Sequence, residues 1–512
     1  MTKLAVDMQK ITVRFGKVIA NNEVDFQAEW GEVHGLVGEN GAGKTTLMRV
    51  LYGMYTHHEG TMLINGEKVD FSSPKDAIAK GIGMVHQHFS LVPSMTVAEN
   101  VVIGRPPYKK GLIDLKKSEQ IVAQLSAEYG LEIDPKMRVS DLTVGLQQRV
   151  EILKALYLGA EILIMDEPTA VLTPQEIKQL METLRSLKEK GKCIILITHK
   201  LAEVRMVTDR ITVMRAGVVT ARVNTADTDE KKIAMMMVGR EVILEVDKQP
   251  FHPGETVLSL KNISCFDRMG LPAVRDVSFD VHRGEVVGIA GVQGNGQSEL
   301  ADAVAGLLPL SHGEVFLNGK LMSGGNVPLL CRENGMGHIH DDRIHVGSAA
   351  DLSIRDNFLA AMYRSDAVKK GPFLDYRKAN EIVEENVKKY KVKIGKITDE
   401  ISSLSGGNMQ KLIIAREMYM QPRLLIASQP TRGVDIGAIE DIRKQLVALR
   451  DSGKAILLVS AELEEILSLS DRIIVMYEGE IVGTFCPEET TEEELGLYMT
   501  GSRRMELDGG AL

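Results

Sequence analysis

The chain has 512 residues, more than one hydrophobic core usually supports, so its length predicts two or more domains. Lys and Arg total 61 against 70 Asp and Glu, and this mild acidic balance of −9 argues against a nucleic-acid-binding protein held mainly by charge. No run approaches the ~20 apolar residues of a membrane span, and the start lacks the apolar core of a signal peptide.

The first strong motif is a glycine-rich loop between a strand predicted over residues 32–37 and a helix predicted over 46–51. It fits G-x-x-x-x-G-K-[ST], the loop that wraps nucleotide phosphates. Backbone N–H groups converge there on an anion, Lys44 can reach the β- and γ-phosphates, and Thr45 can ligate Mg²⁺. The alternative is a glycine-rich turn without a ligand. The predicted phosphate-binding residues are Gly38, Glu39, Asn40, Gly41, Ala42, Gly43, Lys44, Thr45 and Thr46.

Three polar positions follow later strands of the same half. Gln87 comes after residues 83–86 and is placed to sense Mg²⁺ and water. Asp166 and Glu167 end an apolar strand, where Asp166 would hold Mg²⁺ and Glu167 would polarise the attacking water. His199 ends the strand predicted over 193–198 and could reach a γ-phosphate. The alternatives are an acidic helix cap for the carboxylates and a structural role for the histidine.

The chain repeats itself. Residues 30–38 return as 283–291, an offset of 253, and the apolar strand with Pro168-Thr169 returns with Pro430-Thr431, an offset of 262. The second copy therefore carries nine extra residues in its middle. Further echoes are Glu99-Asn100 with Asp356-Asn357, and Asp209-Arg210-Ile211 with Asp471-Arg472-Ile473. Two copies of one domain are expected to fill the chain.

Each copy alternates β-rich runs with helical periodicity, which predicts an α/β fold with a largely parallel sheet. Helices are predicted over 175–189 and 439–450, and the stretches 87–158 and 341–420 are mostly helical in pattern. We expect domains at residues 1–242 and 256–503, a linker at 243–255 with Pro250 and Pro253, and a frayed tail at 504–512. The scattered cysteines, Cys193, Cys265, Cys331 and Cys486, are expected to be reduced thiols of a cytosolic protein.

The phosphate loop, the Asp166-Glu167 pair, His199 and the intervening segment 142–148 resemble the ATP-binding cassette family, in its order and spacing. The resemblance implies two tandem P-loop domains, each with a parallel-rich sheet core, an antiparallel subdomain and a helical subdomain. It makes Gln87 the Q-loop glutamine, 142–148 the signature and His199 the switch histidine, with ATP as substrate and Mg²⁺ as cofactor. Phe15 would stack on adenine, or it could belong to the core.

Family members pair cassettes head to tail, so that ATP on one phosphate loop is closed over by the other copy's signature. The resemblance therefore implies one complete site, in which the first half's motifs meet residues 404–410 and ATP contacts Ser405, Gly406, Gly407 and Gln410. The other site is eroded, which predicts one hydrolytic site and one binding-only or vacant site. Its substitutions are Gln297 for lysine, Asp341 for the Q-loop glutamine, Ser428 and Gln429 for the two carboxylates, Ala461 for histidine and Val144 for a signature glycine.

One competing pattern is a metal cluster. His338, His340 and His345 lie near Asp341 and Asp342, and H-x-H spacing on a strand puts two imidazoles on one face. The repeat alignment places the same residues at the Q-loop of the second half. We therefore favour the Q-loop and keep metal binding as the alternative.

Three features favour an importer subunit: no fused membrane span, a mild acidic balance, and an asymmetric tandem form. The chain resembles the fused ATP-binding subunits of bacterial ribose/galactose-type and nucleoside importers, with a lean to the nucleoside group. The matching segments are residues 85–89, 91–93, 291–297, 404–410, 429–433 and 475–480.

The resemblance implies two integral-membrane permease chains, an extracytoplasmic substrate-binding lipoprotein acting through them, and a peripheral location on the cytoplasmic face of the plasma membrane. The expected permease contacts are residues 88–96, from His88 to Thr96, and residues 343–353, from Arg343 to Ser353. Their apolar members could instead be core of the helical subdomain. The rival functions are a soluble cassette ATPase acting on ribosomes or DNA, and a regulatory module without turnover.

Overall fold

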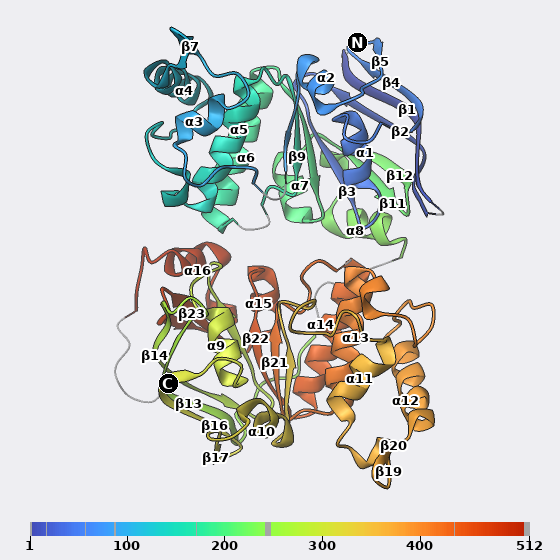
Figure 1. Cartoon of the computed structure of the whole chain (residues 1–512), viewed down its shortest axis with the longest axis vertical. Helices are drawn as coiled ribbons and strands as arrows, with labels where there is room; N and C mark the ends of the chain where they lie inside the picture. The colour runs from blue at the N-terminus through green and yellow to red at the C-terminus, as the bar shows by residue number, and fades with distance from the viewer. Residues whose placement is uncertain are drawn as a thin grey trace. The chain divides into compact units, whose positions relative to one another are not determined.

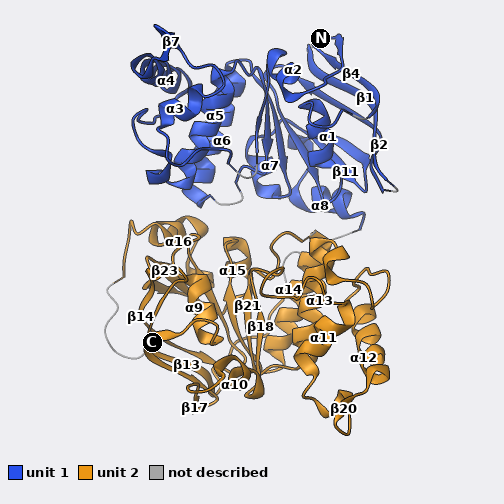
Figure 2. Ribbon diagram, viewed as in Figure 1, with its two compact units in different colours: residues 1–242 blue, residues 243–512 orange. Residues whose placement is uncertain are grey.

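Two compact units make up the chain, residues 1–242 and 243–512 (Figure 2). The computed structural model describes residues 3–16, 18–56, 58–86, 89–169, 172–240, 247–434 and 436–505. Gln87, His88, most of the frayed tail and the first part of the predicted linker lie outside these ranges.

The core of unit 1 is a six-stranded sheet in the order β12-β11-β3-β10-β9-β6 (Figure 1). All neighbours are parallel except β11 and β12. The four central strands are buried along nearly their whole length, which explains why they appear in the sequence as continuous apolar runs. The bounds are β3 Val33–Gly38, β6 Ile82–Val85, β9 Ile162–Asp166, β10 Cys193–Thr198, β11 Arg210–Arg215 and β12 Val218–Asn224.

A second, antiparallel sheet of unit 1 has the order β2-β1-β4-β5. Its apolar face, with Phe26 and Met8, packs with Leu36 of β3 and Leu47 of the phosphate-loop helix in one buried cluster. The antiparallel sheet therefore helps to fix the strand and helix that flank the phosphate loop. The bounds are β1 Leu4–Phe15, β2 Val18–Glu29, β4 Glu59–Ile64 and β5 Glu67–Val69.

The helices of unit 1 include a helical subdomain inserted between β6 and β9, formed by α3, α4, α5 and the small hairpin β7–β8. The bounds are α1 Lys44–Leu51, α2 Pro74–Ala79, α3 Val97–Val102, β7 Tyr108–Lys109, β8 Leu112–Ile113, α4 Leu115–Tyr129, η1 Val139–Asp141, α5 Val144–Tyr157, α6 Pro174–Glu189, α7 Leu201–Val207, η2 Thr225–Asp227 and α8 Glu230–Val238.

Unit 2 repeats this architecture. Its sheets have the orders β18-β21-β22-β15-β23-β24 and β14-β13-β16-β17, the counterparts of the two sheets of unit 1. The bounds are β13 Thr256–Phe266, β14 Pro272–His282, β15 Val286–Ala290, β16 Leu310–Leu317, β17 Lys320–Leu321, β18 Met336–Ile339, β21 Leu424–Ser428, β22 Ala455–Val459, β23 Arg472–Tyr477 and β24 Glu480–Phe485.

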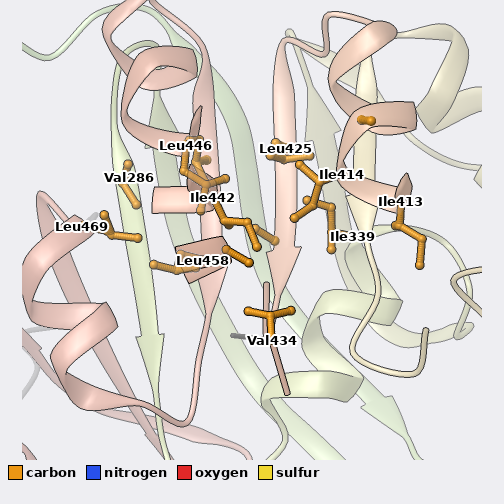
Figure 3. Packing of buried hydrophobic residues seen from close by; sticks show 14 of the residues in the cluster. Val286, Ile339, Ile413, Ile414, Leu425, Val434, Ile442, Leu446, Leu458 and Leu469 are labelled. Atoms are coloured by element: carbon orange, nitrogen blue, oxygen red, sulfur yellow. The ribbon is translucent and has the colours of Figure 1, made fainter. Parts of the chain in front are cut away.

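Helices of unit 2 cover its sheet in the same way. Leu425 and Leu458 on the strands pack against Ile414 of α13 and Ile442 and Leu446 of α14 (Figure 3). The bounds are α9 Gln297–Val304, α10 Val327–Glu333, α11 Ile354–Met362, η3 Asp366–Val368, β19 Lys369–Lys370, β20 Phe373–Leu374, α12 Tyr376–Lys389, η4 Ile401–Ser403, α13 Gly406–Tyr419, α14 Ile436–Asp451, α15 Leu463–Leu469, η5 Pro487–Glu489 and α16 Glu492–Met499. Within the described ranges, no helix is both long and apolar enough to cross a membrane.

The predicted α/β fold is confirmed. The residues repeated between the two halves make equivalent contacts in the two units. Asp209 accepts from the N–H of Val33 at 3.0 Å, and Asp471 accepts from the N–H of Val286 at 2.8 Å. Each aspartate therefore fixes the start of the strand that leads into its glycine-rich loop.

A second pair of repeated residues, Asn100 and Asn357, holds the segments predicted to contact permeases. Asn100 accepts from the N–H of Val92 at 2.8 Å and donates to the Val92 carbonyl at 3.1 Å. Asn357 makes the same pair of bonds with Ala349, at 2.8 and 3.0 Å. Both asparagines are 2% exposed, so each clamps its loop from inside the unit.

Candidate nucleotide site

The phosphate loop lies between β3 and α1. Gly43, with φ 96°, precedes the first residue of α1, and a Cβ there would lie 2.4 Å from the carbonyl oxygen of Ala20. Only glycine fits this position, because the strand passes against the loop and the backbone is left-handed. Asn21 is fully buried and donates to the Gly43 carbonyl at 3.1 Å. Sequence reasoning missed Asn21, since a lone asparagine in a strand carries no motif.

Lys44 is held inside the loop. It is 5% exposed, and its ammonium donates to the carbonyls of Gly38 at 2.7 Å and Glu39 at 2.9 Å. Burial lowers the pKa of Lys44, while the charges of Glu167 and Asp166 oppose that shift. The structure thus places a cation at the centre of the predicted phosphate cradle, at the N-terminus of a helix.

Asp166, at the end of β9, accepts a hydrogen bond from the Thr45 hydroxyl at 3.3 Å. Burial and the neighbouring charge of Glu167 raise the pKa of Asp166. A hydroxyl and a carboxylate oxygen are ligands that suit Mg²⁺, which protein sites usually bind with one or two carboxylates plus phosphates and water. In the described chain, no group of three or more His, Cys, Asp or Glu is arranged to hold a metal, so Thr45 and Asp166 would supply only part of the shell.

Glu167 and His199 form a pair at the ends of the adjacent strands β9 and β10. Their Oε1 and Nδ1 atoms lie 3.0 Å apart. Burial favours the neutral acid, but the hydrogen bond and charge of His199, with Lys44 and Lys200, hold the pKa of Glu167 below its ordinary value. The carboxylate is therefore charged at neutral pH, as a base that polarises water requires.

Phe15 lies at the end of β1 and is 47% exposed, with its ring edge-on to Tyr55 at 5.3 Å between centroids. This exposure argues against the core alternative, and adenine stacking stays a prediction. Thr46 lies in the first turn of α1, and Gln87 lies outside the described residues.

Unit 2 keeps the scaffold of this site without its charges. Gln297 donates to the Val292 carbonyl at 3.2 Å, and Ser298 donates to Asp341 at 3.0 Å. Gln429 accepts from the N–H of Ala461 at 3.2 Å, where unit 1 has its Glu167–His199 pair. The Ser428 hydroxyl is buried without a hydrogen-bond partner in the described structure. The eroded loop therefore offers neither a cation for phosphate nor a general base.

The histidines of the competing metal pattern lie in different surroundings. His340 lies 3.0 Å from Asp302 and 3.0 Å from Asp341, which raise its pKa although burial opposes them. His338 is packed 5.3 Å from the His340 ring, and burial lowers the pKa of His338 to about 4.

The two signature segments start equivalent helices. Gln148 of α5 and Gln410 of α13 each donate to a proline carbonyl, Pro168 at 2.7 Å and Pro430 at 3.0 Å. Gln410 is 2% exposed, so its side chain positions the loop after β21 in this unit. Ser405 is the N-cap residue of α13 and makes no side-chain capping hydrogen bond to the helix. The first N–H groups of a helix have no partner within the helix, so they can bind an anion.

Comparison with known proteins places these motifs in context. A family model described as ABC transporter matches residues 21–170 and 274–432. The guanosine import ATP-binding protein NupO of Bacillus subtilis is 48% identical over 507 residues, covering 98% of each chain. The nucleoside import ATP-binding protein NupA of Lactococcus lactis subsp. cremoris is 45% identical over 496 residues, covering 97% of this chain and 98% of that protein. The glucose import ATP-binding protein TsgD13 of Haloferax volcanii is 45% identical over 534 aligned positions, covering 98% of this chain and 97% of that protein.

Among solved structures, a chain in the complex of archaeal ribosomal stalk protein aP1 with archaeal ribosome recycling factor aABCE1 matches 91% of this chain and 87% of its own length. The TM-score is 0.58 at 18% identity, a likeness that shows the tandem fold alone.

Proposed function

Because the chain belongs to the ABC transporter family, we propose that it is the ATP-hydrolysing, energy-coupling subunit of a bacterial nucleoside importer. The observation that carries the proposal is the full-length similarity to guanosine and nucleoside import ATP-binding proteins, at 48% and 45% identity. The same role in a sugar importer is the second candidate, because glucose and ribose import ATP-binding proteins are 45% and 41% identical.

The chain is an ABC-type ATPase, and the geometry of unit 1 suits that reaction. The loop N–H groups and Lys44 bind the phosphates, and Glu167 accepts the proton of the attacking water. His199 keeps Glu167 charged and oriented. Mg²⁺, held by Thr45 and Asp166, would neutralise charge on the β- and γ-phosphates.

We further propose that one competent site is completed by the signature of unit 2. Ser405 precedes α13, and Gly406 and Gly407 are its first residues. The N–H groups of a first helical turn have no partner within the helix and suit the γ-phosphate. The degenerate loop at Gln297 would bind nucleotide without hydrolysing it, or would stay vacant. Support comes from the contrast between the charged groups of unit 1 and their neutral replacements in unit 2.

The partners are ATP and two integral-membrane permease chains, which would place the protein peripherally on the cytoplasmic face of the membrane. The proposed contacts are residues 88–96 and 343–353, each held by a buried asparagine. A substrate-binding lipoprotein would act indirectly through the permeases. ATP favours the closed arrangement of the cassettes, and hydrolysis removes those contacts.

The rival functions have less support. The likeness to the chain in the ribosome recycling complex is one of fold, which many functions share. A regulatory module without turnover would not need the Glu167–His199 pair, which lies 3.0 Å apart.

The decisive experiment reconstitutes the chain with its co-encoded permeases and binding protein in vesicles. Nucleosides, pentoses and hexoses are added in turn, and ATP hydrolysis is measured. Stimulation by nucleosides alone supports the proposal, stimulation by sugars alone selects the second candidate, and no permease association contradicts both.

A second experiment tests the assignment of the hydrolytic site. Glu167→Gln removes the proton-accepting oxygen but keeps the size of the side chain, so single-turnover hydrolysis should fall by about 10²–10⁴-fold. Gln429→Ala, at the equivalent position of unit 2, should leave the rate near wild type. Near-wild-type hydrolysis by Glu167→Gln would contradict the assignment of Glu167 as the base of the hydrolytic site.

A further inference from the structure

Arg343 lies against the signature of unit 2. A Cβ on Gly406 would lie 2.7 Å from the Nη2 atom of Arg343, and a Cβ on Gly433 would lie 3.3 Å from the same atom. The Nη1 atom donates to the carbonyl of Arg432 at 3.0 Å. The guanidinium therefore fills the space between the first turn of α13 and the loop that follows β21.

This is an unusual place for a cation. The N-terminus of a helix carries partial positive charge, which disfavours a positive side chain. Burial and the neighbouring charge of Arg432 both lower the pKa of Arg343, so a second cation adds to the repulsion. Within the ranges described by the structure, neither guanidinium forms an ion pair with a carboxylate. An anion bound here would offset the positive end of the helix, the burial of the guanidinium and its repulsion by Arg432.

Unit 1 has the opposite charge at the equivalent place. The N–H of Gly145, in the first turn of α5, donates to the Glu176 carboxylate at 3.2 Å. The other oxygen of Glu176 accepts from Thr173, which fixes the carboxylate against the signature helix. The offset of 262 puts Ala438 at the position of Glu176, and the alignment of Asp341 with Gln87 puts Phe89 at the position of Arg343. One signature thus carries its own anion, whereas the other carries a cation.

We propose that Arg343 is a further nucleotide-contacting residue of this ATPase, which binds the γ-phosphate beside Ser405 and Gly406. The proposal rests on the proposed function, in which the signature of unit 2 completes the hydrolytic site. Arg343 also begins the segment proposed to contact a permease, so the same residue would connect that segment to the nucleotide. Glu176 should instead disfavour phosphate at the signature of unit 1, because its carboxylate repels phosphate.

A purely structural role for Arg343, pinning the Arg432 carbonyl, predicts a different result from phosphate binding. ADP lacks the γ-phosphate, so a γ-phosphate contact must separate the affinities for ATP and ADP. We would measure both dissociation constants by isothermal titration on the full chain carrying Glu167→Gln, which prevents turnover. The variants are Arg343→Gln and Arg343→Lys. Arg377→Gln is the matched control, because the Arg377 side chain is 88% exposed and pairs with Glu381 one turn along the same helix.

Arg343→Gln is expected to weaken ATP binding about 10-fold and to leave ADP binding unchanged. Arg343→Lys keeps the charge without the planar pair of donors, so it should lose about 3-fold for ATP alone. It keeps the test informative if Arg343→Gln does not fold. Equal losses for ATP and ADP, or no loss beyond that of Arg377→Gln, would overturn the proposal.

The variant Gly406→Val distinguishes an incorrect role for Arg343 from an incorrect proposed function. It copies Val144 of the first signature and places a side chain where the nucleotide and Arg343 approach. Loss of ATP affinity in Gly406→Val but not in Arg343→Gln overturns the role of Arg343 only. No loss in either variant overturns the pairing of this signature with the hydrolytic site as well.

Discussion

Glu167 and Gln429 share a left-handed backbone, with φ of 47° and 50°. Their N–H groups donate to equivalent carbonyls, Ile197 at 2.9 Å and Val459 at 2.7 Å. A left-handed conformation costs a non-glycine residue roughly 1–2 kcal/mol, so the surrounding strands must impose it. Unit 2 therefore has the same strained turn that holds the proposed catalytic Glu167 in unit 1, although Gln429 cannot accept a proton from water.

The Glu167–His199 pair predicts how activity depends on pH. In His199→Ala, burial of Glu167 is no longer opposed by the hydrogen bond and charge of His199, so the pKa of Glu167 should rise. Because the base is active when charged, the acidic limb of the kcat profile should move to higher pH. At pH 7, kcat should fall about 10–100-fold. Steady-state hydrolysis from pH 5 to 9 checks this, with His199→Gln as the control that keeps a hydrogen-bond donor. An acidic limb that stays in place in His199→Ala would contradict the pairing.

Two glycines of the phosphate loop should respond differently to alanine. Gly43 has φ 96° and a Cβ position 2.4 Å from the Ala20 carbonyl, whereas Gly41 has φ 80° and open space around it. We expect Gly43→Ala to lower the free energy of unfolding by about 2–4 kcal/mol and to abolish ATP binding, against about 1 kcal/mol for Gly41→Ala. Urea denaturation and nucleotide titration measure both effects. Equal losses would show that backbone strain alone, without the close approach of β2, decides the cost.

At the scale of elements, the positions of most candidate-site residues could be predicted from the sequence because these residues stand in local motifs. Lys44 and Thr45 lie in one motif, and Asp166 and Glu167 directly follow an apolar strand, so parallel strands necessarily bring them to one edge. Glu176 and Arg343 could not be predicted in this way. Their contacts with the signature helices depend on how α6 and the loop after β18 pack, and neither residue stands in a motif. The hairpins β7–β8 and β19–β20 were not predicted either. Their strands have two residues each and lie within stretches whose sequence pattern is mostly helical.

The element β3 is anchored by a buried charge network that predicts acid sensitivity. Glu32 accepts from the Nε and Nη2 atoms of Arg210, each at 2.7 Å, and lies 2.9 Å from His34. Burial alone would raise the pKa of Glu32, but these bonds hold it at about 2, below its ordinary value of 4.5. The depressed pKa means that the network stabilises the fold above pH 4.5, and that this stability is lost as pH falls toward 2.

Glu32→Gln should therefore lower the free energy of unfolding at pH 7 by about 2 kcal/mol. The difference from wild type should shrink steadily below pH 4.5. Urea unfolding at pH 7, 5 and 3.5 measures it, and Glu67→Gln, at an exposed pair with Lys80, is the control expected to change little. A difference that grows at low pH would have the wrong sign for this mechanism.

At the scale of the whole molecule, the two units share one fold but carry different charged groups at their loops and signatures. Unit 1 retains the cation, the carboxylates and the histidine at its loop, whereas its signature carries Val144 and the Glu176 carboxylate. Unit 2 has the reverse distribution, with a neutral loop and a signature beside Arg343. Each unit thus lacks groups that the other has, which supports the proposal that the hydrolytic site combines the loop of unit 1 with the signature of unit 2.

This complementarity predicts the number of nucleotides that the chain occludes. With vanadate, Mg²⁺ and ATP, the full chain should trap about one ADP, because the proposed hydrolytic pair, Glu167 and His199, lies beside the loop at Lys44. Lys44→Ala should abolish trapping, since it removes the cation that meets the β- and γ-phosphates. Gln297→Ala, the matched change in unit 2, should leave trapping intact because Gln297 is uncharged and donates to its own loop carbonyl, that of Val292, at 3.2 Å. Radiolabelled nucleotide recovered after gel filtration gives the ratio directly. Two trapped ADP molecules per chain would show that the second loop also hydrolyses ATP, and loss of trapping in Gln297→Ala would show that the second loop is required for trapping.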